Sequence, residues 1–168
     1  MNVQGVTLAL ATISTGMMAG VFFTWSNAVT PGLNKLADIE YLRALQSMNR
    51  VILNPMFYIL FMGAVIFICL ATAVLFRSNP SHLVWMLLSA TVIYCNGVLA
   101  VTVWGNIPLN DVLDRADLGY ITTDKAKSLR STIENRWNNF NMIRSIASSI
   151  SFLILIIVCV LANKVNLP

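Results

Sequence analysis

An arginine and several amides stand in the sequence where they could bind oxygen atoms of a ligand. Trp137, Asn141, Arg144 and Ser148 follow one another at spacings of four, three and four residues, which places them on one stripe of a helix. Amide and guanidinium groups donate hydrogen bonds to oxygen, and aromatic rings form flat apolar walls. This combination suits a flat, oxygenated aromatic or quinone-like ligand.

Residues of the same kinds recur at the ends of other apolar segments. Phe22 and Ser26 are four residues apart, so they share a helical face. Tyr94 and Thr102, about two turns apart, share one as well. The residues that we expect to contact a ligand are Phe22, Ser26, Asn27, Gln46, Asn49, Tyr94, Thr102, Asn110 and Trp137, with Asn106, Asn141 and Arg144 as further donors.

Each of these polar residues also has a purely structural interpretation. Asn, Ser and Thr side chains often hydrogen-bond across membrane helices only to hold them together. Arg144 either binds a ligand oxygen or forms an ion pair with Asp111, Asp114 or Glu134. The concentration of polar residues at one membrane face favours a pocket over separate structural contacts.

The elements that carry these residues are predicted to be membrane-spanning helices. The chain is 57% hydrophobic and only 11% charged, whereas soluble domains have about 25% charged residues. Four apolar runs, about 3–29, 55–76, 83–104 and 142–162, reach the roughly 20 residues that a transmembrane helix needs. The sequence therefore predicts an all-α, integral membrane four-helix bundle that forms a single domain over residues 1–168.

The connections between the spans are unequal in length. A tight turn around residues 79–81 joins the second and third spans, and Pro31-Gly32 is predicted to stop the first. Residues 30–54 contain a short amphipathic helix marked by Leu36, Ile39, Leu42, Leu45 and Met48. In the connection 105–141, Asn110 or Asp111 is expected to start one helix, and Thr123 to Arg136 is expected to form another.

Four spans place the two long connections on the same side of the membrane. All seven acidic residues and nine of the eleven basic residues, counting Arg144, belong to that side. The polar ends of all four spans meet there, and buried polar groups in membrane proteins commonly mark functional positions. The count of basic residues places this side in the cytoplasm, and we expect a multi-pass protein of a bacterial plasma membrane.

Several classes of function are disfavoured by composition. The net charge of +4 without a basic run gives no reason to expect nucleic acid. The only histidine, His82, lies on the side opposite the polar cluster, so no metal centre is expected. The three cysteines lie in apolar runs and form no Cys-x-x-Cys pair, which argues against a thiol oxidoreductase. The expected partners are the lipid bilayer and a hydrophobic small molecule, and an oligomer is left open.

The order of these motifs resembles the anthrone oxygenase family. The resemblance covers nearly the whole chain and is carried by Ala19-Gly20-Val21-Phe22-Phe23 with Ser26-Asn27, Gln46-Ser47-Met48-Asn49, Asn54-Pro55-Met56-Phe57, Tyr94 with Gly97 and Thr102, Asn106-Ile107-Pro108-Leu109-Asn110, and Trp137 with Asn141 and Arg144. The chain departs from the family pattern at Phe140 and Met142, where relatives often have Trp and His.

The resemblance implies an oxygenase that converts anthrone-like or phenolic compounds with dioxygen as co-substrate and without metal or flavin. In such a reaction a base removes a proton from a carbon acid, and donors stabilise the resulting oxyanion. Asn106, Asn141 and Arg144 would be the donors, and Asp111 or Asp114 the base. The alternative is a non-enzymatic membrane protein that binds a quinone, lipid or hydrophobic metabolite, or a small subunit of a larger complex.

Overall fold

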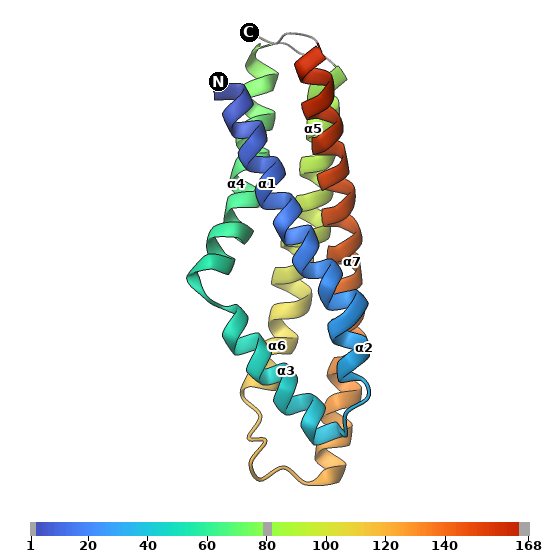
Figure 1. Cartoon of the computed structure of the whole chain (residues 1–168). Helices are drawn as coiled ribbons and strands as arrows, with labels where there is room; N and C mark the ends of the chain where they lie inside the picture. Colours follow the sequence, from blue (N-terminus) through green and yellow to red (C-terminus); the bar gives the residue numbers. More distant parts are fainter. Residues whose placement is uncertain (1–2, 79–81, 165–168) are drawn as a thin grey trace.

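The structure is a computed structural model that describes residues 3–78 and 82–164. The described chain is all-α and contains four helices long and apolar enough to cross a membrane, which confirms the predicted fold class. Their ranges are Val3–Leu33, Pro55–Arg77, His82–Asp114 and Thr123–Ala162. The start of the first and the end of the last lie at the same end of the bundle (Figure 1). The predicted tight turn at residues 79–81 lies outside the described residues.

Two of the four spans are not regular α-helices along their whole length. The first consists of α1 (Val3–Thr24), a π-helical segment η1 (Trp25–Val29) and α2 (Thr30–Leu33). The third consists of α5 (His82–Tyr94), the π-helical segments η2 (Cys95–Ala100) and η3 (Thr102–Asn106), and α6 (Ile107–Asp114). Segments with π-helical turns are rare and occur often at functional sites. The other elements are α3 (Asp38–Ile52), α4 (Pro55–Ser78) and α7 (Thr123–Lys164).

The structure corrects three predicted helix boundaries. Pro31 does not stop the first span, because it lies in the first turn of α2, where its missing N–H is tolerated. Asn110 and Asp111 do not start a helix, because α6 begins at Ile107 and directly continues the third span. The predicted helix from Thr123 to Arg136 is present, but it is the first part of the 42-residue helix α7, which also contains the fourth span. At 1.5 Å per residue α7 is about 60 Å long and extends well beyond a bilayer core of about 30 Å.

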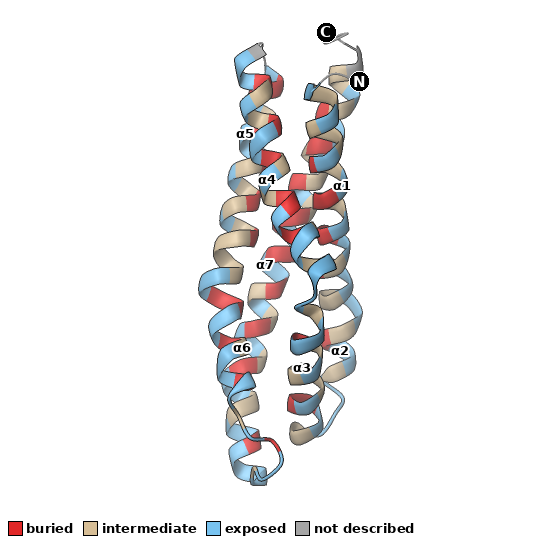
Figure 2. Ribbon diagram, turned by 90° about the vertical axis from the view of Figure 1, so that its left-hand side faces the viewer, coloured by how far each residue is buried: buried red, intermediate tan, exposed pale blue. Residues whose placement is uncertain are grey.

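Close packing of small residues holds the third and fourth spans together. A Cβ atom added to Gly97 in η2 would collide with the Cβ of Ala147 in α7. Small residues at such contacts let helix backbones approach, which is the main way in which helices associate inside lipid. The buried apolar core of the bundle as a whole includes Met18, Ile68 and Leu155, and buried residues recur along the long helices (Figure 2).

A second apolar core lies outside the membrane-spanning part. The amphipathic helix α3 is present as predicted and lies beside α6 and the first half of α7 (Figure 1). Its Tyr41, Leu42 and Leu45 pack with Leu113 and Ile133. An ion-pair group fastens the region from outside: Arg130 of α7 contacts Asp38 at 3.0 Å and Glu134 at 2.7 Å, and donates to the backbone oxygens of Asn34 and Leu36. The two cores meet at the level of the polar span ends.

Candidate functional site

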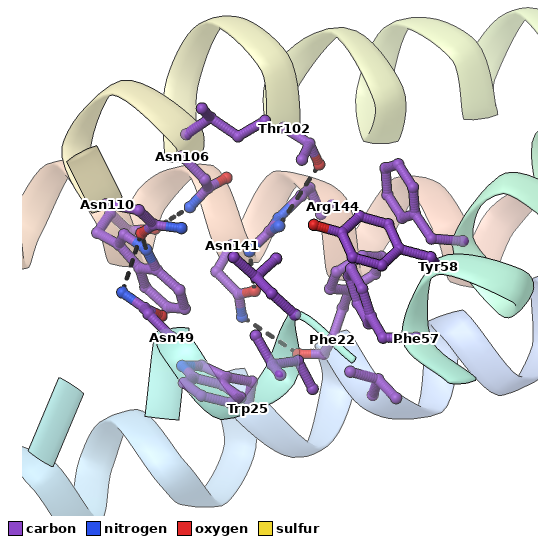
Figure 3. Close-up of a pocket in the computed structure, with 16 residues that line it drawn as sticks. Phe22, Trp25, Asn49, Phe57, Tyr58, Thr102, Asn106, Asn110, Asn141 and Arg144 are labelled. Carbon is purple, nitrogen blue, oxygen red and sulfur yellow. Dashed lines mark hydrogen bonds between the residues drawn. The ribbon is translucent and has the colours of Figure 1, made fainter. Parts of the chain in front are cut away.

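A cavity of about 140 Å³ lies where the polar ends of the four spans meet α3. Figure 3 shows side chains from α1, α4, η3, α6 and α7 converging on it. It is lined by Val21, Phe22, Trp25, Asn49, Ile52, Leu53, Phe57, Tyr58, Phe61, Thr102, Asn106, Ile107, Asn110, Trp137, Asn141 and Arg144. The lining is therefore largely aromatic and aliphatic, with a few amides, one hydroxyl of threonine and one guanidinium.

Arg144 is the one cation of this lining, and its side chain is 6% exposed. Its guanidinium carbon lies 4.5 Å from the centroid of the Phe22 ring and 5.6 Å from that of Trp137. The guanidinium donates to Asn141 Oδ1 at 2.7 Å and to Thr102 Oγ1 at 3.4 Å. None of the lining residues carries a carboxylate, so within the described chain the charge of Arg144 rests on neutral groups. The predicted ion pair of Arg144 with Asp111, Asp114 or Glu134 is absent from the described residues.

Asn141 holds the arginine and ties α7 to the first span. Its Nδ2 donates to Ser26 Oγ at 2.7 Å and to the backbone oxygen of Phe22 at 3.2 Å. With Nδ2 used in this way, Oδ1 faces Arg144 and accepts its hydrogen bond. Ser26 thus contacts the site through Asn141 and does not line the cavity.

A second hydrogen-bonded group closes the cavity on the side of α3. Asn110 Oδ1 accepts hydrogen bonds from Trp137 Nε1 at 2.8 Å and from Asn49 Nδ2 at 3.0 Å. Asn49 and Asn110 also line a neighbouring polar pocket of about 230 Å³, together with Gln46, Arg50, Leu53, Asp111 and Asp114. The Asn49–Asn110–Trp137 group therefore stands between the cavity and this polar pocket.

Three buried polar atoms of the lining have no hydrogen-bond partner among the described residues. They are Nε1 of Trp25, Oδ1 of Asn106 and Nε of Arg144. A buried polar atom without a partner costs about 1–3 kcal/mol, so such atoms are normally satisfied by protein, water or ligand. Two donors and one acceptor of the lining residues thus stay unpaired within the described chain.

The structure separates the predicted contact residues into two sets. Phe22, Asn49, Thr102, Asn106, Asn110, Trp137, Asn141 and Arg144 line the cavity. Ser26, Asn27, Gln46, Tyr94 and Asp111 do not. Asn27 is exposed on the outside of η1. Gln46 donates to the backbone oxygens of Leu113 and Ala116 and so fastens α3 to the end of α6.

The two predicted bases and Tyr94 also lie away from the cavity. Asp111 is exposed and lines the neighbouring polar pocket, and Asp114 forms an ion pair with Arg50 at 2.5 Å. Tyr94 is fully buried in the apolar core of the bundle. The spacing argument joined Tyr94 to Thr102 with an α-helical period, but η2 and η3 intervene. Thr102 lines the cavity and Tyr94 does not.

Sequence reasoning missed the aromatic residues that complete the cavity. Trp25 packs against Trp137 with ring centroids 5.5 Å apart, and Phe57 stacks on Phe61 at 5.6 Å. Tyr58 joins them from the first turn of α4 (Figure 3). The available signal was the run of aromatic residues at the start of the second span, which is also typical of residues that only anchor a helix at the membrane surface.

Comparison with known proteins places the chain in a family. A family model described as anthrone oxygenase matches residues 55–154, well over half of the chain. The matched region includes Asn106, Asn110, Trp137, Asn141 and Arg144 and ends before the last turns of α7. No curated protein and no solved structure matches the chain. With its four long apolar helices and this match, the chain belongs to the anthrone oxygenase family.

Proposed function

We propose that this protein is a membrane-embedded oxygenase that oxidises a hydrophobic anthrone-like or phenolic molecule with dioxygen. The observation that carries the proposal is the placement of Arg144, a buried cation with neutral partners, in an aromatic-lined cavity. Removing a charge from water is costly unless it is paired. A ligand that becomes an anion during the reaction therefore gains stabilisation from Arg144 as its charge develops.

For an anthrone-like substrate, the reaction converts a CH₂ group that is conjugated with an aromatic carbonyl into a C=O group. The substrate loses a proton to give an enolate, the enolate passes an electron to dioxygen, and the radical pair combines to a peroxide. The peroxide takes up a proton and eliminates water, so that CH₂ and O₂ become C=O and H₂O. Throughout, the chain supplies an aromatic-lined pocket and the guanidinium of Arg144 as the donor to the oxyanion.

The proton leaves toward the polar pocket beside the cavity. No carboxylate lines the cavity, so no base lies next to the substrate. The positive charge of Arg144 instead lowers the pKa of the substrate's C–H group, because it stabilises the enolate that forms. Asp111 acts at a distance, as the acceptor that receives the proton through water past Asn49 and Asn110. This role differs from direct proton abstraction and requires no contact between Asp111 and the substrate.

Oxygen uptake by the purified protein tests the proposal. Uptake is measured with anthrone-like and hydroquinone-like compounds in nanodiscs, with Arg144→Ala beside the parent and the exposed Arg136→Ala on the same helix as the control. We expect substrate-dependent uptake in the parent and in Arg136→Ala and none above background in a folded Arg144→Ala protein. A ligand-induced thermal shift without uptake for any compound would instead support the alternative of a non-enzymatic binding protein. Normal uptake by Arg144→Ala would remove this residue from the mechanism.

A further inference from the structure

We propose that a flat aromatic molecule dissolved in the bilayer enters the cavity sideways, through an opening between the start of α4 and the junction of η3 with α6. This opening, which we call the mouth, is formed by Leu53, Tyr58 and Ile107. The proposal concerns the route to the site, and it rests on the proposed function only for the chemistry carried out there.

The mouth is the most exposed part of the cavity lining. Leu53, Tyr58 and Ile107 are 56%, 49% and 44% exposed, whereas the other lining residues are buried or half-buried. The corner at which α3 meets α4 stands apart from the third span in both overall views (Figures 1 and 2). The cavity is therefore walled by buried residues of α1 and α7 and is open between the second and third spans.

Both sides of the mouth belong to uncharged stretches of the membrane spans. No Asp, Glu, Lys or Arg occurs between Arg50 and Arg77, or between His82 and Asp111. The exposed large side chains beside the mouth are Met56, Ile59, Val103 and Trp104. Apolar surface of this kind is stable in lipid, and Tyr and Trp side chains are enriched at the level of the headgroups. The mouth therefore faces the bilayer just below its headgroups.

The way from the cavity to water passes through a hydrogen-bonded group. Asn49 and Trp137 donate to Asn110 between the cavity and the neighbouring polar pocket, which contains the exposed ion pair of Arg50 with Asp114. An aromatic ring coming from that pocket would have to separate these hydrogen bonds and leave buried donors unpaired. A molecule coming from the lipid meets exposed apolar side chains at the mouth instead.

An apolar groove between α1 and α4 is the rival route from the lipid. Val21 and Trp25 line both the groove and the cavity. The ring of Trp25 packs on Trp137 with centroids 5.5 Å apart, so passage from the groove requires this contact to open. At the mouth the lining itself is exposed, and entry there needs no such movement.

The mouth also means that the cavity volume of about 140 Å³ sets no limit on ligand length. A three-ring compound with its polar edge toward Arg144 extends its far ring between Tyr58 and Ile107 toward the lipid. Apolar substituents on that ring stay in the bilayer, where they are not exposed to water.

A photoreactive lipid tests the mouth in the parent protein. The probe is a phosphatidylcholine that carries a benzophenone on a short acyl chain, so the reactive ketone stays below the headgroups and cannot leave the membrane. After irradiation in liposomes, the adducts are mapped by mass spectrometry. We expect adducts on the buried lining residues Phe22 and Phe61 as well as on the lipid-facing Ile66 and Val92. Adducts on Ile66 and Val92 alone overturn the inference.

A reversible bridge distinguishes the mouth from the groove. Tyr58→Cys and Ile107→Cys are joined by a bis-maleimide whose linker contains a disulfide, and the control pair Met17→Cys and Leu60→Cys is joined across the groove in the same way. Both pairs are made in a chain that carries Cys69→Ala, Cys95→Ala and Cys159→Ala.

Free benzophenone is the probe for the bridged proteins. We expect the adducts on Phe22 and Phe61 to be lost when the mouth is bridged and to return when the linker is reduced, while those on Ile66 stay unchanged. The bridge across the groove should leave all adducts in place. Undiminished labelling of Phe22 with the mouth bridged, or loss only with the groove bridged, overturns the inference. If the cysteine variants do not fold, the photoreactive lipid on the parent decides.

The route and the proposed oxygenase activity fail separately. Mouth-dependent labelling of Phe22 and Phe61, without oxygen uptake for any compound, sinks the oxygenase proposal and leaves the route standing. Undiminished oxygen uptake by the protein with its mouth bridged supports the oxygenase and overturns the route.

Discussion

Arg144 and Asn141 lie one turn apart on α7, and the guanidinium donates to the amide oxygen of Asn141 at 2.7 Å. The same amide donates through its nitrogen to Ser26 and to the backbone of Phe22. These two hydrogen bonds to the first span fix the orientation of the Asn141 amide, so its Oδ1 atom faces Arg144. A neutral oxygen in this position leaves the positive charge of the site uncompensated.

Asn141→Asp should convert this contact into an internal ion pair. A carboxylate next to Arg144 neutralises the buried charge, so we expect oxygen uptake by the folded variant to fall at least about tenfold. The control is Asn139→Asp, an exposed position on the same helix. Unchanged oxygen uptake by Asn141→Asp would show that the reaction does not use the charge of Arg144.

Asn110→Leu should destabilise the protein, since Trp137 and Asn49 both donate to Asn110. Leaving two buried donors unpaired costs about 2 kcal/mol or more, to be measured by thermal or denaturant unfolding. The matched control is Asn96→Leu, because Asn96 is exposed on η2 and, among the described residues, donates to Val92 of its own helix. Equal stability of the two variants would contradict the closing role of Asn110.

Gly97→Ala should weaken the contact between η2 and α7. The added methyl group collides with Ala147, and overpacking of this kind costs about 1–3 kcal/mol. Gly20→Ala is the control, because a Cβ at Gly20 meets no atom within 4 Å. The second change Ala147→Gly should recover most of the loss in Gly97→Ala, and failure to recover it would argue against direct contact as the cause.

Tyr41 should make the stability of the α3 region depend on alkaline pH. Burial, with a further contribution from Glu134, raises the pKa of its phenol from 10.0 to about 12, and Arg130 acts in the opposite direction. Because the folded state holds the proton more tightly than the unfolded state, this stabilisation is full below pH 10 and is lost as the pH rises toward 12. Comparing unfolding of the parent and Tyr41→Phe between pH 8 and about 11 checks this. The variant should lose less stability over that interval than the parent.

The sequence determined that this protein lies in a lipid bilayer, and it determined which segments cross that bilayer. The four apolar runs admit only helices in lipid, because a backbone without internal hydrogen bonds cannot be satisfied there. The 4-3-4 spacing of Trp137, Asn141, Arg144 and Ser148 also lies within one regular α-helix, so the periodicity argument holds for that stripe. Local spacing is reliable where the helix is regular, since each residue then advances by a constant angle.

Only the tertiary structure decided which of the remaining polar residues meet at the cavity. Thr102 in η3 lines the cavity whereas Tyr94 lies in the apolar core, and no periodic pattern in the sequence predicts the π-helical segments η2 and η3 that follow Tyr94. The position of Asp111 in a separate pocket and the approach of Trp25 to Trp137 depend on how α6 and α3 dock against α7. These contacts join residues far apart in the chain, and their geometry is set by the packing of whole helices, which short-range sequence patterns do not encode.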